Sequence, residues 1–306
     1  GTKKSSQCTL ILTEGDSAKT MAITGISAIK NIKPNDYFGI FPLRGKLLNV
    51  REATHKQIIN NEEFKNIKMI LGLEMGKKYD KDNISDLRYG SVLLFFDADV
   101  DGSHIKGLFI NMIDFYWPSL LQIDGFIKIF ITPMIKASKK NEIISFYTFS
   151  DFEKWKKKNE QHLWKIKYYK GLGTNTIIEA KEYFSNLEEN TLYLNWNNID
   201  DEVAINLAFA KDRADERKLW LKNYKKNVTI DYSKSNITYF EFINKELIHF
   251  SNYDNIRSIP NIMDGLKPAQ RKVLYSAFKK NLNSDIKVAQ FVGYISEHTA
   301  YHHGEN

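Results

Sequence analysis

Two short apolar segments each run directly into a cluster of acidic residues, and this pattern constrains the fold more than any other feature. Thr9 to Thr13 leads into Glu14-Gly15-Asp16-Ser17, and Ser91 to Phe96 leads into Asp97-Ala98-Asp99-Val100-Asp101-Gly102. After the second cluster, apolar residues recur at helical spacing from Ile105 to Tyr116, and Pro118 predicts the end of that helix. Strands that feed helices through short turns predict an α/β fold built on a parallel sheet flanked by helices.

The two acidic clusters predict a metal site. Ligands of open α/β sheets bind at the carboxyl ends of the strands, so both clusters can meet at one edge. Asp97, Asp99 and Asp101 occupy alternate positions and repel one another unless a cation lies among them. Carboxylate oxygens are hard ligands, which favours Mg²⁺ or Ca²⁺ over zinc.

Two simpler interpretations of the aspartates compete with a catalytic metal. Aspartates in a turn are most often solvated caps. Asp97, Asp99, Asp101 and Gly102 also match the first, third, fifth and sixth positions of an EF-hand loop, but Leu108 replaces the glutamate of the twelfth. The segment before the loop is also strand-like. We therefore favour a Mg²⁺ site for phosphate chemistry, with Glu14 as a ligand or an acid/base group.

Composition indicates the kind of partner. A net charge of +7 and a pI of about 9.1 favour an anionic partner such as nucleic acid, although lysine-rich surfaces are often simply solvated. The 306 residues, 42% of them hydrophobic, are enough to bury a core. The single Cys8 excludes a disulfide framework, and no apolar run approaches the roughly 18 residues of a membrane span. We expect an intracellular protein.

The second half of the chain is more polar. Asp201 to Tyr224 is predicted as one charged helix with Val203 and Leu207 on its apolar face, and the polar stretch Asn227 to Asn236 predicts a linker with a boundary near residue 235. Helix-like segments follow at 240–250, 267–280 and 286–300, as in a helix-turn-helix or winged-helix unit. In the second of these, the spacing predicts one basic face for DNA and one core face made of Val273, Leu274, Ala277 and Phe278.

Longer strings resemble one family. Beside the acidic clusters, the chain contains Pro42-Leu43-Arg44-Gly45-Lys46-Leu47-Leu48-Asn49-Val50-Arg51-Glu52-Ala53, Tyr168-Tyr169-Lys170-Gly171-Leu172-Gly173-Thr174, Asp264-Gly265-Leu266-Lys267-Pro268-Ala269-Gln270-Arg271-Lys272 and Tyr301-His302-His303-Gly304-Glu305. In order and spacing these resemble eukaryotic-type type II DNA topoisomerases, whose metal-binding part is a TOPRIM domain. The resemblance implies a Rossmann-like TOPRIM domain at 8–136, its extension and linker at 137–235, and the start of a winged-helix DNA-binding domain at 236–306.

The resemblance also implies roles for individual residues. Glu14, Asp97, Asp99 and Asp101 would hold Mg²⁺, with Mn²⁺ or Ca²⁺ as possible substitutes, and Glu14 would help return the 3′ oxygen during religation. His303 would lie beside the scissile phosphate, which makes Glu14, Asp97, Asp99 and His303 the expected catalytic set. The expected DNA contacts are Arg44, Lys46, Asn49, Lys170, Lys211, Arg271, Lys272, Lys280, Tyr301, His302 and His303.

The family cuts DNA with a tyrosine that follows an arginine, shortly after the His-His-Gly-Glu motif. We expect this tyrosine beyond Asn306, because Arg88-Tyr89 leads into the second strand and is not the nucleophile. The chain should bind Mg²⁺ and duplex DNA without cutting. ATP should bind only to a preceding region of the parent enzyme, which should be a homodimer.

Two residues between the aspartates bear on the lineage of the protein, and the lineage determines the compartment in which we expect the parent enzyme. Ala98 and Val100 stand where cellular eukaryotic enzymes commonly have glutamine, which favours a divergent or viral lineage. The parent is expected in the nucleus of a cellular eukaryote, or in the host cell or virion if it is viral.

Two alternative functions are open at this point. The acidic pattern also occurs in primases and some nucleases, but those would not need the basic helices after residue 235. The other alternative is a DNA-binding module without catalytic activity. Substitution of Asp97 and Asp99 separates these alternatives, since only a metal-dependent enzyme would lose cleavage.

Overall fold

The structure is a computed structural model that describes residues 4–30, 32–169 and 171–301. Its contacts divide the chain into two compact units, Gly1–Phe250 and Ser251–Asn306, called unit 1 and unit 2 below. No helix in the described ranges is long and apolar enough to cross a membrane. The domain division predicted near residue 235 stays a prediction.

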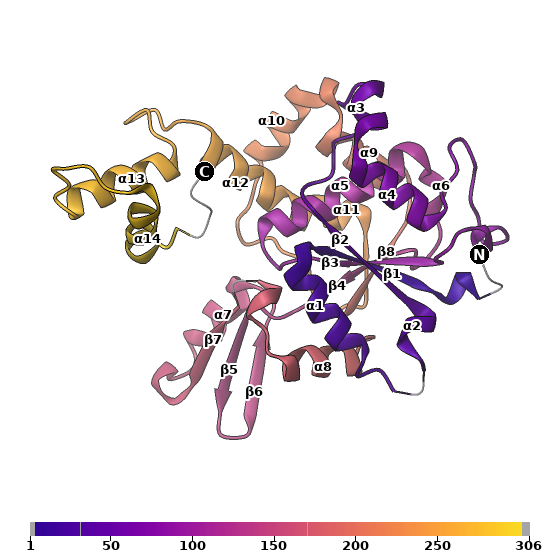
Figure 1. The fold of residues 1–306 in the computed structure, drawn as a ribbon, viewed down its shortest axis with the longest axis horizontal. Coiled ribbons are helices and arrows are strands. Elements are labelled where there is room, and N and C mark those ends of the chain that lie inside the picture. Colours follow the sequence, from indigo (N-terminus) through magenta and orange to yellow (C-terminus); the bar gives the residue numbers. More distant parts are fainter. Residues whose placement is uncertain (1–3, 31, 170, 302–306) are drawn as a thin grey trace. The chain divides into compact units, whose positions relative to one another are not determined.

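Unit 1 is built on a six-stranded sheet of order β2-β1-β3-β4-β8-β9 (Figure 1). β1 pairs in parallel with both β2 and β3, β3 is parallel to β4, and only the pairing of β4 with β8 is antiparallel. The predicted α/β fold with a mainly parallel sheet is therefore confirmed. The strands are β1 (Thr9–Glu14), β2 (Phe38–Leu43), β3 (Ser91–Phe95), β4 (Ile127–Phe130), β8 (Thr191–Asn195) and β9 (Asn236–Thr238).

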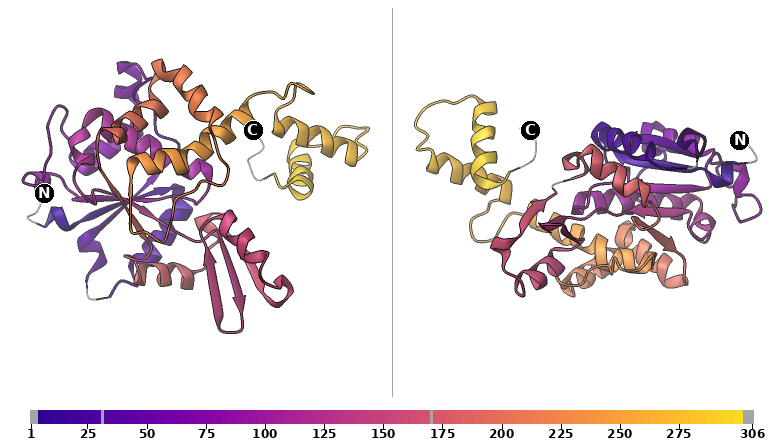
Figure 2. Two further views of the ribbon diagram at one scale, coloured as in Figure 1. Left: turned by 180° about the vertical axis from the view of Figure 1, so that it is seen from behind. Right: turned by 90° about the horizontal axis from the view of Figure 1, so that it is seen from below.

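Helices cover both faces of this sheet (Figure 2). Alternate strand residues point to opposite faces, so Leu10 and Leu12 join one apolar cluster while Ile11 joins the other. Burial on both faces explains why these strands are continuous apolar runs. The helices of unit 1 before β9 are α1 (Gly15–Ile26), α2 (Pro34–Tyr37), α3 (His55–Asn60), α4 (Glu62–Leu71), α5 (Val100–Tyr116), α6 (Pro118–Leu121), α7 (Phe149–Lys156), α8 (Ile177–Ser185), α9 (Ile199–Phe209) and α10 (Ala214–Lys222).

A second, antiparallel sheet of order β6-β5-β7 lies apart from the main sheet. It consists of β5 (Ile135–Lys139), β6 (Glu142–Phe146) and β7 (Lys165–Tyr168), and α7 packs on one face of it around Phe146 and Phe152. Figures 1 and 2 show these elements projecting from the main sheet of unit 1. We call residues 135–168 the projecting module.

The prediction of one helix over Asp201 to Tyr224 is wrong. α9 ends at Phe209 because Ala210 is extended (φ −78°, ψ 135°), and a 3₁₀ turn (Lys211–Arg213) precedes α10. Arg217 of α10 donates hydrogen bonds to the carbonyls of Leu207 and Ala210, which ties the two helices together at the break. The predicted apolar face fails too, since Val203 is 45% exposed.

The last part of unit 1 packs closely against the main sheet. Ile230, in the polar stretch before β9, is buried, and β9 pairs with β8. A short helix α11 (Tyr239–Phe242) then passes into a π-helical turn (Ile243–Leu247) and on into α12 (Ile248–Ser258). π-Helical turns are rare and occur often at functional sites.

Unit 2 contains the later part of α12, α13 (Pro268–Lys279) and α14 (Val288–Thr299), close to the predicted helices. The predicted core face of α13 is wrong in this structure. Val273, Leu274 and Phe278 are 46%, 45% and 72% exposed. Ser276 and Ile295 are the only buried side chains among the described residues of unit 2, so none of these residues forms a layer that covers this face.

Candidate metal centre

The two acidic clusters meet at the carboxyl edge of the main sheet. Glu14 is the last residue of β1, and Asp97, Asp99 and Asp101 follow the neighbouring parallel strand β3 into α5. Partial burial, together with the negative charges of these three aspartates, raises the pKa of Glu14 to about 7, against the opposing effect of Lys46. The four carboxyl groups therefore share one electrostatic environment.

Asp97 is held by the glycine-rich loop after β7. Its Oδ1 atom accepts a hydrogen bond from the backbone N–H of Leu172 at 2.8 Å. A Cβ atom on Gly171 would lie 2.3 Å from Asp97 Oδ2, so only glycine allows this close approach. Burial raises the pKa of Asp97, and the Leu172 N–H partly opposes that rise. The loop that follows the predicted DNA contact Lys170 thus positions an acidic residue.

Asp99 and Asp101 are engaged differently. Asp99 caps α5, accepting a hydrogen bond from the backbone N–H of Gly102 at 2.7 Å. Asp101 accepts one from Lys46 Nζ at 2.6 Å. The same ammonium group lies 3.3 Å from His104 Nδ1 and 4.8 Å from the centre of the Phe250 ring. A cation, the lysine ammonium, therefore already lies among the acidic side chains.

The donor set fits a hard divalent cation, although it is not arranged as a cage. Among the described residues, no three His, Cys, Asp or Glu side chains converge as a ready metal site. A small cavity of about 50 Å³ borders Asp99, Gly171 and Asn175, and the amide oxygen of Asn175 is buried without a described hydrogen-bond partner. Glu14, Asp97, Asp99 and Asp101 would hold the ion, which when bound stabilises charge on a phosphate and its leaving oxygen.

The predicted DNA contacts of unit 1 differ in whether their side chains are exposed or are used in hydrogen bonds within the protein. Arg44 is exposed after β2, and its backbone N–H donates to Glu63 Oε1 at 3.1 Å, while its side chain has no hydrogen bond or ion pair to the residues that the structure describes. Asn49 instead uses its side chain internally: Nδ2 donates to the Phe209 carbonyl at 3.0 Å, and Oδ1 accepts from Asn111 at 2.9 Å. Lys211 is exposed. Asn49 therefore supports the loop in this structure, and its contact with DNA stays a prediction.

In unit 2, Arg271 donates two hydrogen bonds to Asp264, at 2.7 and 2.8 Å. These and the N–H of Leu266 lower the pKa of Asp264 to about 2. Lys272 is partly buried, while Lys280 is exposed and lies 4.6 Å from the centre of the Tyr294 ring. Tyr301 is half-buried. The predicted site residues Lys170, His302 and His303 lie outside the described residues.

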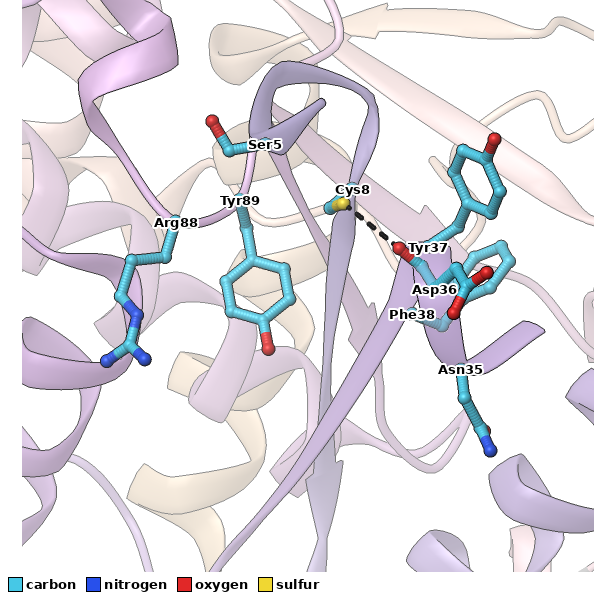
Figure 3. A pocket seen from close by; sticks show the side chains of 8 residues that line it. All are labelled: Ser5, Cys8, Asn35, Asp36, Tyr37, Phe38, Arg88 and Tyr89. Carbon is cyan, nitrogen blue, oxygen red and sulfur yellow. Dashed lines mark hydrogen bonds between the residues drawn. The ribbon is translucent and has the colours of Figure 1, made fainter. Parts of the chain in front are cut away.

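A separate cavity of about 220 Å³ lies near the amino ends of β1 and β2, away from the acidic residues. Figure 3 shows Cys8, Asp36, Arg88 and Tyr89 among its lining residues, with the thiol of Cys8 donating to the Asp36 carbonyl at 3.5 Å. None of the predicted metal ligands or DNA contacts lines it. The cavity does not belong to the candidate metal centre.

The sequence did not predict a buried polar cluster next to Asp99, at the start of α5. The hydroxyl of Ser103 lies 3.0 Å from the Asp99 carbonyl oxygen and 2.8 Å from Glu246 Oε1. Lys106 Nζ donates to the same Glu246 oxygen at 2.8 Å, and the Tyr232 hydroxyl donates to Oε2 at 3.4 Å. No sequence pattern pairs Lys106 with a residue so far along the chain. The cluster connects the start of α5 to the π-helical turn.

Family models match this fold along nearly the whole chain. The Toprim domain model matches residues 9–132, and the model for the C-terminal associated domain of TOPRIM matches 130–255. The chain is therefore a Toprim-domain protein, as the acidic edge of the parallel sheet indicates. A third model, that of DNA gyrase/topoisomerase IV, matches residues 257–306.

Individual relatives narrow the class further. The chain is 52% identical over 303 residues to DNA topoisomerase 2 of Plasmodium falciparum and 50% identical over 319 residues to DNA topoisomerase 2-alpha of Rattus norvegicus, covering 99% and 100% of its own length. The crystal structure of the Plasmodium falciparum topoisomerase II DNA-binding, cleavage and re-ligation domain superposes with a TM-score of 0.88 at 52% identity, over 100% of this chain and 41% of that one. The chain belongs to the type II DNA topoisomerase family. It spans 21% of the length of each of these two curated relatives.

Proposed function

We propose that this chain supplies the metal-binding acids and part of the DNA contacts of a type II DNA topoisomerase. Such an enzyme makes a transient double-strand break in one duplex, passes a second duplex through it in an ATP-dependent cycle, and religates. The attacking tyrosine and the ATP site belong to other parts of the parent polypeptide in this proposal. The isolated chain therefore binds but does not cut.

The observation that carries this proposal is the meeting of Glu14 with Asp97, Asp99 and Asp101 at one sheet edge, with the pKa of Glu14 raised to about 7. Carboxylates that repel one another in this way bind a divalent cation favourably. We propose Mg²⁺ as the ion, with Mn²⁺ and Ca²⁺ as substitutes. The names of the relatives, all DNA topoisomerase 2, support duplex DNA as the substrate.

The parent is proposed to act as a homodimer in which the tyrosine of one subunit reaches the metal of the other. We propose that the parent works in the nucleus, which its eukaryotic relatives support, whereas a viral origin would place it in a host cell or virion. His303 and His302 are proposed to lie beside the scissile phosphate. The remaining DNA contacts proposed are Arg44, Lys46, Asn49, Lys170, Lys211, Arg271, Lys272, Lys280 and Tyr301.

The metal site is tested by calorimetric titration of the chain with Ca²⁺ and Mg²⁺. Asp97→Asn and Asp99→Asn should each weaken binding by more than about tenfold, because even loss of an outer-shell partner costs that much in metal sites. Asp82→Asn removes an exposed carboxylate elsewhere and should leave binding unchanged. Equal affinities in all four proteins would refute the site.

The reaction is tested in the longer polypeptide that contains the tyrosine. Asp97→Asn should abolish relaxation of supercoiled plasmid there, while Asp82→Asn should retain it. Survival of relaxation in Asp97→Asn would support a DNA-binding role without metal catalysis. A covalent DNA complex formed by residues 1–306 alone would contradict the assignment of the nucleophile to another segment.

A further inference from the structure

The projecting module contains most of the excess positive charge of the chain. Residues 135–168 include nine lysines and four carboxylates, a net charge of +5 against +7 for all 306 residues. The rest of the chain is nearly neutral by comparison. Charge concentrated on one protruding element produces a local positive potential that the net charge of the whole chain does not reveal.

Several of these lysines are not neutralised by neighbours. Lys154 and Lys156 pair with carboxylates on their own helix, and Lys136 and Lys167 pair with glutamates of α8. Lys140, Lys157, Lys158 and Lys165 are all exposed, and no carboxylate of the described residues lies within 4.0 Å of their ammonium groups. These four side chains form what we call the module lysines.

The fold brings lysines from different segments together. Lys165 of β7 is the register partner of Ser138 in β5, which places it beside the strand that leads to Lys139 and Lys140. Lys157 and Lys158 lie directly after α7, which packs on the same small sheet. The positive residues therefore come from the β5–β6 turn, from β7 and from the end of α7. No single helical face accounts for them.

A cluster of packed aromatic side chains lies inside the projecting module. Trp155 contacts Phe146, Phe152 and Trp164, with ring centres 5.3, 5.8 and 5.1 Å apart, and Lys139 Nζ lies 5.6 Å from the centre of the Trp164 ring. Packed aromatic side chains fix the backbone that carries the charges, so less conformational freedom is lost on binding.

The β5–β6 turn adds an independent observation. Lys140 adopts a positive φ of 54°, a region in which glycine and asparagine are favoured and a lysine is strained by about 1 kcal/mol. The next residue, Asn141, is of a type that tolerates positive φ, yet the positive φ falls on Lys140. A strained lysine at the tip of a protruding turn is consistent with a binding role for its charge.

We propose that the module lysines are a further contact surface for duplex DNA, made of residues other than those of the metal centre and other than the predicted DNA contacts. Each strand of a duplex carries one phosphate per about 3.4 Å of helix axis, so several phosphates fall within the length of a five-residue strand such as β5. Lysine ammonium groups bind such a backbone without reading its sequence. The surface would hold a stretch of duplex through its phosphates.

Duplex DNA fits this surface better than an acidic protein does. The module lysines are spread over three segments, and a protein partner of ordinary affinity would also need an apolar contact patch at its centre. Phe146 and Phe152 are instead buried between the sheet and α7, and the exposed apolar side chains of the module come from four different elements rather than one: Ile143 from β6, Phe149 from α7, Leu163 from the 3₁₀ turn before β7, and Tyr168 from β7. Binding of an acidic polypeptide in place of DNA would overturn the proposal.

The test compares two variants of residues 1–306 that lose the same charge. The first changes the module lysines together, Lys140→Gln, Lys157→Gln, Lys158→Gln and Lys165→Gln. The control changes four exposed lysines outside the module that likewise have no described carboxylate within 4.0 Å: Lys30→Gln, Lys56→Gln, Lys65→Gln and Lys78→Gln. Binding of a fluorescent 30-base-pair duplex is followed by anisotropy over a range of NaCl concentrations.

EDTA is present throughout, so the outcome does not depend on the metal-centre proposal. The module variant should bind at least about tenfold more weakly at low salt. The slope of log K against log salt should also fall by about 3 to 4, since each phosphate contact contributes about 0.9. The control variant should keep both the affinity and the slope of the unchanged chain. Thermal unfolding of both variants should match that of the unchanged chain.

Three results would overturn the proposal. Equal losses in the two variants would mean that net charge alone governs binding. Unchanged DNA binding in the module variant would mean that the module does not contact the duplex. Loss of binding to polyglutamate without loss of binding to DNA would assign the surface to an acidic protein. Each result leaves the Asp97→Asn metal titration unaffected, so failure here is distinguishable from failure of the proposed function.

Discussion

The ammonium group of Lys106 lies 2.8 Å from Glu246 Oε1, and both side chains are almost fully buried, at 6% and 10% exposure. Lys106 belongs to α5, just after the acidic loop, and Glu246 belongs to the π-helical turn before α12. Isolated buried charges are strongly unfavourable, so each side chain depends on the other. Burial raises the pKa of Asp97, and the positive charge of Lys106 slightly opposes that rise.

Removal of one partner should therefore be far more damaging than removal of both. Lys106→Met or Glu246→Met alone should reduce the free energy of unfolding by about 3–5 kcal/mol, because an unpaired charge remains buried. The double variant should lose clearly less than the sum of the two. Urea unfolding at constant pH gives the free energy of unfolding of the unchanged chain, the two single variants and the double variant. Additive losses would show that the two side chains are not coupled.

Glu179 makes the stability of the small sheet sensitive to acid. Burial alone would raise the pKa of Glu179, but hydrogen bonds from Lys167, from the Thr176 backbone and from Tyr169 outweigh it and lower the pKa to about 2 from an ordinary 4.5. A lowered pKa stabilises the fold above pH 4.5, and this contribution is lost as the pH falls toward 2.

Glu179→Gln should therefore reduce stability at pH 7 by about 1–2 kcal/mol, after allowance for solvent screening, and should flatten the pH dependence between 4.5 and 2. Glu182→Gln is the matched control on α8, because its carboxylate is 59% exposed and lies 4.0 Å from Lys136. Denaturant midpoints at several pH values provide the measurement. Parallel curves for the unchanged chain and Glu179→Gln would contradict the prediction.

The sheet edge could be predicted from the sequence because its signals are local. Apolar runs that end in acidic residues predict strands, and parallel pairing then places Glu14 and Asp97 at the same edge. The longer motifs that resemble the topoisomerase family predict which residues surround that edge. What they could not predict is how each acid is held, since Asp97 meets Leu172 from 75 positions away and Lys106 meets Glu246 from 140.

The errors in the helical regions have a common physical origin. Periodicity predicts that a helix has an apolar side, but it does not show whether another layer is present to bury that side. The exposed Val273 and Phe278 of α13 illustrate this point. The break at Ala210 is similar, because alanine favours a helix and only the tertiary bonds of Arg217 reveal the interruption.

Gly171 tests whether the glycine-rich loop positions Asp97. In Gly171→Ala the new Cβ would lie 2.3 Å from Asp97 Oδ2, so the carboxylate must move and its bond from Leu172 N–H is lost. Ca²⁺ affinity should fall about tenfold or more, with a stability loss of about 1–3 kcal/mol. Gly173→Ala is a control in the same loop, because its Cβ would meet only Ser17 Cβ at an ordinary 3.7 Å. Similar titration curves for the two variants would argue against a positioning role for Gly171.

Lys46 tests whether the lysine ammonium competes with a divalent ion for the acidic edge. It lies 2.6 Å from Asp101 and lowers the pKa of Glu14, so it repels any further cation placed there. Lys46→Met should raise Ca²⁺ affinity by about two- to tenfold, since two unit charges about 4 Å apart interact by about 1 kcal/mol even when water screens them fully. Lys56→Met, an exposed lysine of α3, should leave the affinity unchanged. Duplex binding should weaken in Lys46→Met if the same ammonium contacts phosphate. A fall in Ca²⁺ affinity would instead mean that Lys46 holds Asp101 in the conformation that the ion requires.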